Sequence, residues 1–206
     1  MLLIGQYLSP FTRRVAVALR HYGIAYNHEE WSAFSDPERI AGFNPALRVP
    51  VLVLDGGEAL IESAAILDYL DELSQTGDAL IAPRGPERRR VLHICALAGA
   101  LCDKAIAIIY EKRNHAAVSE SWLRRCEDQI SGVLGALEAD RASRKTPFWF
   151  GERLSHADVA VTVAITFLKH VNDGFAARRE WPALDEFAAC CERIPEFAAT
   201  APRPPK

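Results

Sequence analysis

The segment NPALRVPVLVLDGGEALIESAAILDYL, residues 44–70, is the part of the sequence that indicates most about the fold. It predicts a loop, a strand that begins at Val49-Pro50, a turn at 55–57, a second strand, and a helix that begins at Glu62-Ser63. Proline has no backbone N–H, so it suits the first position of a strand or its edge. An X-Pro bond is also where cis peptides occur, and a bend there would turn the N–H and C=O of Val49 outward. Ser63 would lie at the positive end of its helix, where backbone N–H groups bind anions.

The start of the chain completes the pattern of an α/β domain. Residues 1–8 are an apolar run that predicts a strand, and residues 13–22 predict an amphipathic helix. Between them, Ser9 suits an N-cap and Pro10 suits the first helical position. A second strand, a short helix and the strand–strand–helix segment described above follow. This order predicts a thioredoxin-like α/β domain over residues 1–76.

The second half of the chain is predicted to be helical. Turn residues at 75–86 mark a linker, beyond which the strand signals end. Apolar side chains recur at helical spacing over residues 91–108, and residues 158–170 are apolar almost all round, which indicates a helix buried in a bundle. The predicted fold class is therefore an α/β thioredoxin-like N-terminal domain followed by an all-α helical bundle over residues 87–206.

Ser155 and Asp158 predict how the central helix of this bundle begins. They have the spacing of a capping box, with Asp in place of the usual Glu or Gln. We expect the Ser155 hydroxyl to accept the N–H of Asp158, and the Asp158 carboxylate to accept the N–H of Ser155. The role is structural, and Asp158→Ala is expected to destabilise the protein by about 1 to 2 kcal/mol.

Composition and charge exclude several classes of partner. The 206-residue chain is 50% apolar and has a net charge of −3, so we expect no nucleic-acid partner. The basic run at 88–90 is local, and we interpret it as the solvated start of a helix. The most apolar segment, residues 159–168, is too short to span a bilayer, so no membrane partner is expected. The N-terminus lacks the basic region of a signal peptide.

The cysteines and histidines indicate neither a disulfide framework nor a metal site. The five cysteines are odd in number and include no CxxC pair, so we interpret them as reduced thiols in a reducing, cytoplasmic compartment. The six histidines show no metal-binding spacing. We therefore predict no bound metal.

Taken together, these motifs resemble the cytosolic glutathione S-transferase superfamily over nearly the whole chain. The matching motifs are Ser9-Pro10-Phe11, Asn44-Pro45, Val49-Pro50-Val51-Leu52, Glu62-Ser63, Ile66-Leu67-Asp68-Tyr69-Leu70 and Ser155-x-x-Asp158. Each motif is weak alone, but their order and spacing are specific. Within the superfamily, the chain is similar to bacterial members that open the first helix with Ser-Pro-Phe, as the plant tau class also does. The resemblance implies a homodimer that uses glutathione as a co-substrate.

The resemblance also implies that Ser9 activates the thiol of glutathione. A thiol with a pKa of about 8.5 is only slightly ionised at neutral pH, and both a hydroxyl donor and a helix N-terminus favour the thiolate. Ser9 would supply the hydroxyl, and Phe11 and Thr12 would supply the first helical amides. Thr12 is a reserve hydroxyl for the same role. Considered alone, Ser9 is a helix cap.

The rest of glutathione is assigned to five other positions by the same resemblance. Glu62 would meet the γ-glutamyl amine, and Ser63 with its own N–H would meet the γ-glutamyl carboxylate. The backbone of Val49, which precedes Pro50, would pair with the cysteinyl N–H and C=O as a strand does. Arg48 lies where related sequences carry Lys, Arg or Gln near the glycyl carboxylate. The alternatives are a plain helix cap for Glu62-Ser63 and a solvated loop cation for Arg48.

A pocket for a hydrophobic electrophile is predicted between the first helix and the first long helix of the second domain. Tyr7 precedes the Ser-Pro-Phe motif, and Ile106 and Tyr110 lie one turn apart on the long helix. The alternatives are that Tyr7 packs at the end of its strand and that the other two belong to the bundle core or a dimer surface. The sequence does not identify the electrophile.

We therefore expect a glutathione S-transferase that conjugates the thiolate of glutathione to small hydrophobic electrophiles, as in detoxification. Positions 9 and 12 carry no cysteine, which excludes thiol–disulfide exchange by a protein thiol there. Peroxide reduction, dehalogenation and isomerisation are alternatives that use the same glutathione. A non-catalytic binding partner in stress response or transcription is a further alternative, against which the intact set of glutathione motifs argues.

Overall fold

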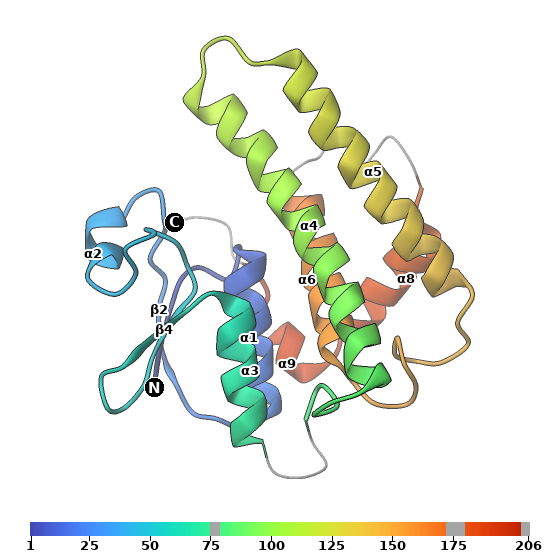
Figure 1. Ribbon diagram of the computed structural model, residues 1–206, viewed down its shortest axis with the longest axis horizontal. Coiled ribbons are helices and arrows are strands. Elements are labelled where there is room, and N and C mark those ends of the chain that lie inside the picture. Colours follow the sequence, from blue (N-terminus) through green and yellow to red (C-terminus); the bar gives the residue numbers. More distant parts are fainter. Residues whose placement is uncertain (75–78, 172–179, 203–206) are drawn as a thin grey trace. The chain divides into compact units, whose positions relative to one another are not determined.

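The computed structural model describes residues 1–74, 79–171 and 180–202 of the chain (Figure 1). The chain forms two compact units, of which one is made of Met1–Leu80 with Glu192–Lys206 and the other of Ile81–Cys191. The first unit combines a small sheet with helices, and the described part of the second is built of helices. This architecture confirms the predicted fold class.

The division between the units falls after Leu80, inside the predicted linker at 75–86. Residues 75–78 of that linker lie outside the described residues. The predicted second domain reached residue 206, whereas the structure assigns the chain from Glu192 onward to the first unit.

A four-stranded sheet lies at the centre of the first unit, with the strand order β2-β1-β3-β4. The strands are β1 (Leu2–Ile4), β2 (Asn27–Glu29), β3 (Val51–Val53) and β4 (Ala59–Ile61). β1 runs parallel to β2 and antiparallel to β3, and β4 pairs antiparallel with β3. Leu3, Ile4, Val51 and Leu52 are fully inaccessible to solvent, so the two central strands carry the apolar core.

The helices that the structure describes in the first unit are α1 (Pro10–His21), α2 (Pro37–Ala41), α3 (Ser63–Leu73) and α9 (Pro195–Ala198). α1 begins where the sequence predicts, with Ser9 as N-cap and Pro10 as its first residue. The continuous run from Val15 to Leu19 on α1 is fully buried. α1 packs against both α3 and α9.

Gly5 directly follows β1, at a point where the backbone passes very close to other elements. Its φ is +132°, a conformation that side chains disfavour. A Cβ at this position would lie 2.4 Å from Thr12 Oγ1 and 2.9 Å from Val49 Cβ. Glycine therefore allows the end of β1, the first turn of α1 and the loop before β3 to pack together.

A buried arginine attaches the C-terminal segment to the first unit. Arg13 on α1 is 1% exposed, and its Nη1 and Nη2 donate to the two carboxylate oxygens of Glu192, the first of them at 2.7 Å. Its Nε donates to the carbonyl oxygen of Thr200 at 2.9 Å, and Nη2 to that of Phe197 at 3.1 Å. Arg13 thus contacts three residues of the 192–200 segment and, with the fully buried Phe197, holds it beside α1.

The described helices of the second unit are α4 (Pro86–Asn114), α5 (Glu120–Ala142), α6 (His156–Val171) and α8 (Pro182–Cys191). α4 and α5 form a long pair, and α6 packs against both α4 and α8 (Figure 1). α6 is buried continuously from His156 to Ile165, which is the position in the bundle that the sequence predicts for it.

α4 is the helix, among the described residues, that is long and apolar enough to cross a membrane by length and composition alone. Core helices of soluble proteins pass the same test, so it is weak evidence. In this unit α4 packs against α5 and α6.

Asp158 satisfies three donors at the start of α6. Its Oδ2 accepts the N–H of Ser155 at 2.7 Å and the hydroxyl of Ser155 at 2.6 Å, and its Oδ1 accepts the N–H of Trp149 at 2.6 Å. The expected bond from the Ser155 N–H is present. The other expected bond differs, because the Ser155 hydroxyl donates to the carboxylate instead of accepting the Asp158 N–H. Burial raises the pKa of Asp158, and the hydrogen bonds oppose that shift only in part.

Candidate functional site

Three backbone segments of the first unit meet at one place: the N-terminus of α1, the loop before β3 and the N-terminus of α3. Gly5 lies between Thr12 of α1 and Val49 of the loop, so these two elements touch the same point. The guanidinium of Arg14 on α1 donates a hydrogen bond to the hydroxyl of Ser63, the first residue of α3. The second turn of α1 and the start of α3 are therefore in contact.

An ion pair joins the loop to the start of α3. Arg48 Nη1 lies 3.4 Å from Glu62 Oε1, with both side chains more than half exposed. Exposed pairs of this kind contribute little to stability. The two residues assigned to opposite ends of glutathione thus contact each other and can both turn toward solvent.

The loop before β3 is held by a buried amide. Asn44 is 1% exposed; its Oδ1 accepts the N–H of Ala46 at 2.9 Å, and its Nδ2 donates to the carbonyl oxygen of Arg48 at 2.8 Å. Leu47 occupies the left-handed region with a φ of 55°, and the Val49-Pro50 bond is cis. The amide of Asn44 therefore fixes the path of the chain up to Val49.

Val49 presents an unused backbone edge. Its N–H and C=O make no hydrogen bond to any residue in the described part of the chain. The ladder with β1 begins only at Val51. An extended peptide could pair with Val49 as a strand pairs with the edge of a sheet.

The start of α3 has the properties of an anion-binding site. Ser63 is 2% exposed, and no acidic side chain lies in the first turn of α3, so the positive end of the helix is not neutralised there. Glu62 has a φ of 64° and a ψ of 116°, which is a strained backbone conformation for a residue with a side chain. Such outliers cluster at ligand sites, so the strain supports a binding role for this turn.

Arg14 lies at the candidate site and was not predicted from the sequence. Besides its bond to Ser63, its guanidinium lies 5.5 Å from the centroid of the Phe11 ring. The spacing of three residues between Phe11 and Arg14 places both on neighbouring parts of one helix face, which was the available signal. The sequence could not show that Ser63, 49 residues further on, would face the same guanidinium.

Ser9 is half-buried and caps α1. Its Oγ accepts the N–H of Thr12 at 3.4 Å, which is a long bond. A hydroxyl has one hydrogen to donate and two acceptor lone pairs, so this cap leaves the hydrogen of Ser9 for another partner. Capping and donation to a thiolate are compatible roles for one side chain.

Thr12 differs from Ser9 in accessibility. Its side chain is fully inaccessible, and its Oγ1 has no hydrogen-bond partner among the described residues. The hydroxyl is enclosed against Gly5. Of the two hydroxyls assigned to the thiol, Ser9 is therefore the one with exposed surface.

The residues predicted to line an electrophile pocket are spread over both units. The Tyr7 hydroxyl lies 2.8 Å from that of Tyr26, and its ring stacks on His28 with the centroids 4.1 Å apart. Burial, helped by the bond with Tyr26, raises the pKa of Tyr7. Ile106 and Tyr110 lie on α4, the first half-buried and the second 40% exposed. A pocket shared between these positions stays a prediction.

The cysteines of the protein are free thiols, and the described residues contain no cluster of side chains that could hold a metal ion. None of the five cysteines forms a disulfide with another. Over residues 1–74, 79–171 and 180–202, no group of three His, Cys, Asp or Glu side chains is arranged to hold a metal ion. The site therefore consists of hydroxyl, guanidinium, carboxylate and backbone groups.

Comparison with protein families gives matches in both halves of the chain. The model of the N-terminal domain of glutathione S-transferases matches residues 3–77, and that of the C-terminal domain matches residues 120–190. The GST-like protein YibF of Escherichia coli K12 is 36% identical over 140 residues, which cover 67% of this chain and 68% of the relative. The chain therefore belongs to the glutathione S-transferase superfamily.

Solved structures show the same architecture. A glutathione transferase family member from Pseudomonas fluorescens Pf-5, solved with bound glutathione, superposes with a TM-score of 0.85 at 29% identity, covering 98% of this chain and 99% of the other. A glutathione S-transferase from Methylobacillus flagellatus KT with bound glutathione superposes with a TM-score of 0.89 at 27% identity, covering 98% and 99%. Both proteins resemble this chain over its full length.

Proposed function

We propose that this protein is a glutathione transferase enzyme, which joins the thiolate of glutathione to a small hydrophobic electrophile. The observation that carries the proposal is the contact between Arg14 and the buried Ser63 hydroxyl at the N-terminus of α3. It brings a guanidinium, a hydroxyl and free helical N–H groups to one point, as a carboxylate ligand requires. Relatives crystallised with glutathione support the same ligand.

Glutathione would bind along the three backbone segments. Its γ-glutamyl carboxylate would accept hydrogen bonds from Ser63 and Arg14, and its amine would meet Glu62. Its cysteinyl N–H and C=O would pair with the unused backbone edge of Val49, just before Pro50. Arg48 would leave its exposed pair with Glu62 for the glycyl carboxylate.

Ser9 would stabilise the thiolate. Its hydroxyl hydrogen would donate to sulfur, while the Phe11 N–H and the positive end of α1 would favour the charged form. The thiol proton passes to solvent, the sulfur lone pair forms a bond to the electrophilic carbon, and a leaving group departs or an activated double bond takes up a proton. Thr12 is the reserve donor, although its burial favours Ser9.

Several finer assignments belong to the same proposal. We propose a cytoplasmic homodimer whose Ser-Pro-Phe motif acts as in tau-like transferases, with Tyr7, Ile106 and Tyr110 lining the electrophile pocket and no metal involved. Peroxide reduction, dehalogenation and isomerisation would use the same thiolate. Product analysis with representative electrophiles, a peroxide and a haloalkane separates these reactions.

Calorimetric titration with glutathione tests the anion site. Arg14→Gln removes the charge that contacts Ser63, and affinity should fall about tenfold or more because a charged hydrogen bond is lost. Arg20→Gln is the matched control, since Arg20 is exposed on the same helix, and it should change affinity less than twofold. If the wild type does not bind glutathione at millimolar concentration, the transferase activity is excluded. A non-catalytic role as a binding partner is then favoured.

Ultraviolet titration of the bound thiol tests Ser9. The wild type should lower the thiol pKa, and Ser9→Ala should return it toward its ordinary value with glutathione still bound. Ser121→Ala, an exposed serine on α5, is the control and should leave the thiol pKa unchanged. If the thiol pKa stays lowered in Ser9→Ala, the helical amides or Thr12 stabilise the thiolate instead.

A further inference from the structure

The loop that joins β1 to α1 carries Ser9, and both backbone polar groups of its first residue are hydrogen-bonded to β2. The N–H of Gly5 donates to the carbonyl oxygen of Glu29 at 2.9 Å, and the carbonyl oxygen of Gly5 lies 2.8 Å from Nε2 of His28. A carbonyl oxygen only accepts hydrogen bonds, so the His28 ring is the donor. An edge strand of the sheet therefore fixes where this loop begins.

Tyr7 extends the same attachment toward Ser9. Its ring lies parallel to that of His28, at an interplanar angle of 10° and a centroid distance of 4.1 Å, and its hydroxyl lies 2.8 Å from that of Tyr26. The N–H of Ser9 donates to the carbonyl oxygen of Gln6 at 3.0 Å, which closes a turn around Tyr7. The loop is therefore held again two residues before Ser9.

This attachment matters because the helix itself holds Ser9 weakly. The cap bond from the N–H of Thr12 to Ser9 Oγ is 3.4 Å long. Gly5 also touches the rest of the candidate site, since a side chain there would overlap Thr12 and Val49. A shift of Gly5 would therefore disturb both the start of α1 and the backbone edge of Val49.

Tyr7, Tyr26 and His28 are half-buried and lie outside the fully buried core of the sheet. Removal of the His28 ring therefore loosens the loop without emptying the core. We infer, on the basis of the proposed function, that His28 is a positioning residue for Ser9. Through its contacts with Gly5 and Tyr7, it holds the Ser9 hydroxyl where that group reaches the sulfur of glutathione. Groups that act on a substrate need support of this kind, to within about 0.5 Å.

Ultraviolet titration of the thiol of bound glutathione tests His28. His28→Ala removes the donor to Gly5, so the Ser9 hydroxyl loses its placement. The thiol pKa should rise above that in the wild type by about half a pH unit or more, which is about a threefold loss of thiolate. Calorimetry should still detect glutathione binding to this variant, because Arg14 and Ser63 are unchanged.

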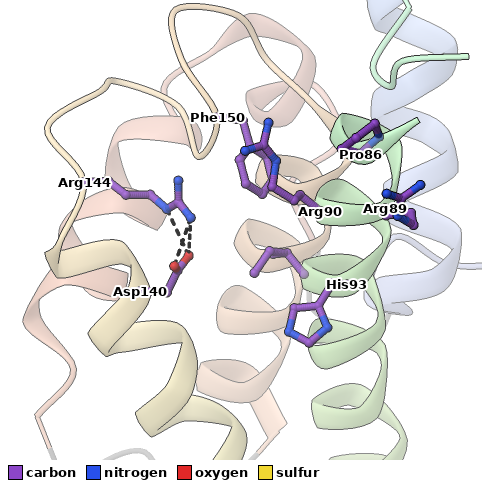
Figure 2. A pocket seen from close by; sticks show the side chains of 8 residues that line it. Pro86, Arg89, Arg90, His93, Asp140, Arg144 and Phe150 are labelled. Carbon is purple, nitrogen blue, oxygen red and sulfur yellow. Dashed lines mark hydrogen bonds and ion pairs between the residues drawn. The ribbon is translucent and has the colours of Figure 1, made fainter. Parts of the chain in front are cut away.

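Asn27→Ala and His93→Ala are the controls, and both should leave the thiol pKa unchanged. Asn27 is exposed on the same strand, and His93 is an exposed histidine that lines an open pocket of the second unit (Figure 2). His28→Gln is the conservative variant. Its amide keeps an N–H for the Gly5 carbonyl oxygen, so the thiol pKa should return toward the wild-type value.

Tyr7→Leu tests the stacked contact independently, and it keeps the inference testable if His28→Ala fails to fold. The variant should also raise the thiol pKa. Combined with His28→Ala, it should add less than its separate effect, because the two side chains act on one loop. Fully additive effects would overturn the role of the stacked pair.

The remaining outcomes separate this inference from the proposed function. A thiol pKa that stays lowered in His28→Ala, while glutathione binds, overturns the inference and leaves the proposed function intact. Equally raised thiol pKa values in His28→Ala and His28→Gln would overturn the role of the Gly5 bond. A wild type that binds glutathione without lowering the thiol pKa would contradict the proposed function itself.

Discussion

Arg13 and Asp158 are both buried charges at the start of a helix, but they are satisfied in opposite ways. Arg13 in the first unit is 1% exposed and Asp158 in the second is 0% exposed. Asp158 takes all its partners from residues within nine positions of itself. Arg13 takes its partners from a segment 179 to 187 positions away.

Asp158 therefore acts locally, at the start of its own helix, whereas Arg13 joins two segments that are distant in the sequence. Asp158 caps the first turn of α6, a helix that packing would bury in any case. Its contribution is therefore limited to the start of that helix. Arg13 holds a short segment of chain to α1 together with the packing of the fully buried Phe197. We therefore expect the loss of Arg13 to be the more damaging of the two.

Replacement of Arg13 should have the largest effect. Arg13→Ala removes one donor from the Glu192 carboxylate and one each from the carbonyl oxygens of Phe197 and Thr200, and breaking a largely buried ion pair in this way costs about 3 to 5 kcal/mol. Urea unfolding followed by circular dichroism measures the loss. Arg20→Ala, exposed on the same helix, should cost less than about 0.5 kcal/mol. Equal losses in the two variants would show that the C-terminal segment is not tethered by Arg13.

Replacement of Asp158 should come next. Asp158→Ala leaves three donors without an acceptor, two on Ser155 and one on Trp149, which we expect to cost about 3 kcal/mol. That exceeds the value expected for a capping box because the Trp149 bond was not foreseen. The exposed Asp103 on α4 provides the control, and Asp103→Ala should be close to neutral in the same unfolding experiment. A cost below about 1 kcal/mol would mean that water enters to replace the carboxylate.

Neutralising Glu192 separates the contribution of the ion pair from that of the carbonyl hydrogen bonds of Arg13. Glu192→Gln keeps the shape of the side chain and one acceptor for Arg13, while the two carbonyl bonds of Arg13 persist. We expect a loss of about 1 kcal/mol in the free energy of unfolding. A loss as large as that of Arg13→Ala would show that the ionic contact, and not the set of carbonyl bonds, holds the segment.

Acidification should give the smallest effect, and comparison with Asp158→Asn isolates the contribution of Asp158. Burial raises its folded-state pKa above the ordinary 3.8, so on acidification the folded protein takes up this proton before the unfolded chain does. The wild type should therefore gain stability relative to Asp158→Asn as the pH falls from neutral toward 4. Urea midpoints at pH 7, 6 and 5 measure the difference. A shift in the opposite direction would mean that the hydrogen bonds outweigh burial.

The same contrast explains what could be predicted from the sequence. The start of α1 at Ser9-Pro10 and the N–H bond within the Ser155–Asp158 pair depend on neighbours in the chain, and local rules describe them. The bond between Arg14 and Ser63 joins two helices, and the attachment of residues 192–200 joins the two ends of the chain. Neither contact leaves a periodic pattern in the sequence, so both required the structure.

The second unit interrupts the first, and this order has a consequence for protein synthesis. An N-terminal domain usually folds while the rest of its chain is still being made, at about 5 to 20 residues per second. Here Glu192 follows Arg13 by 179 residues, so Arg13 waits about 9 to 36 seconds on the ribosome before its partner exists. Over that interval the face of α1 that carries Arg13 is uncovered, and the helical unit has time to fold before the first unit is complete.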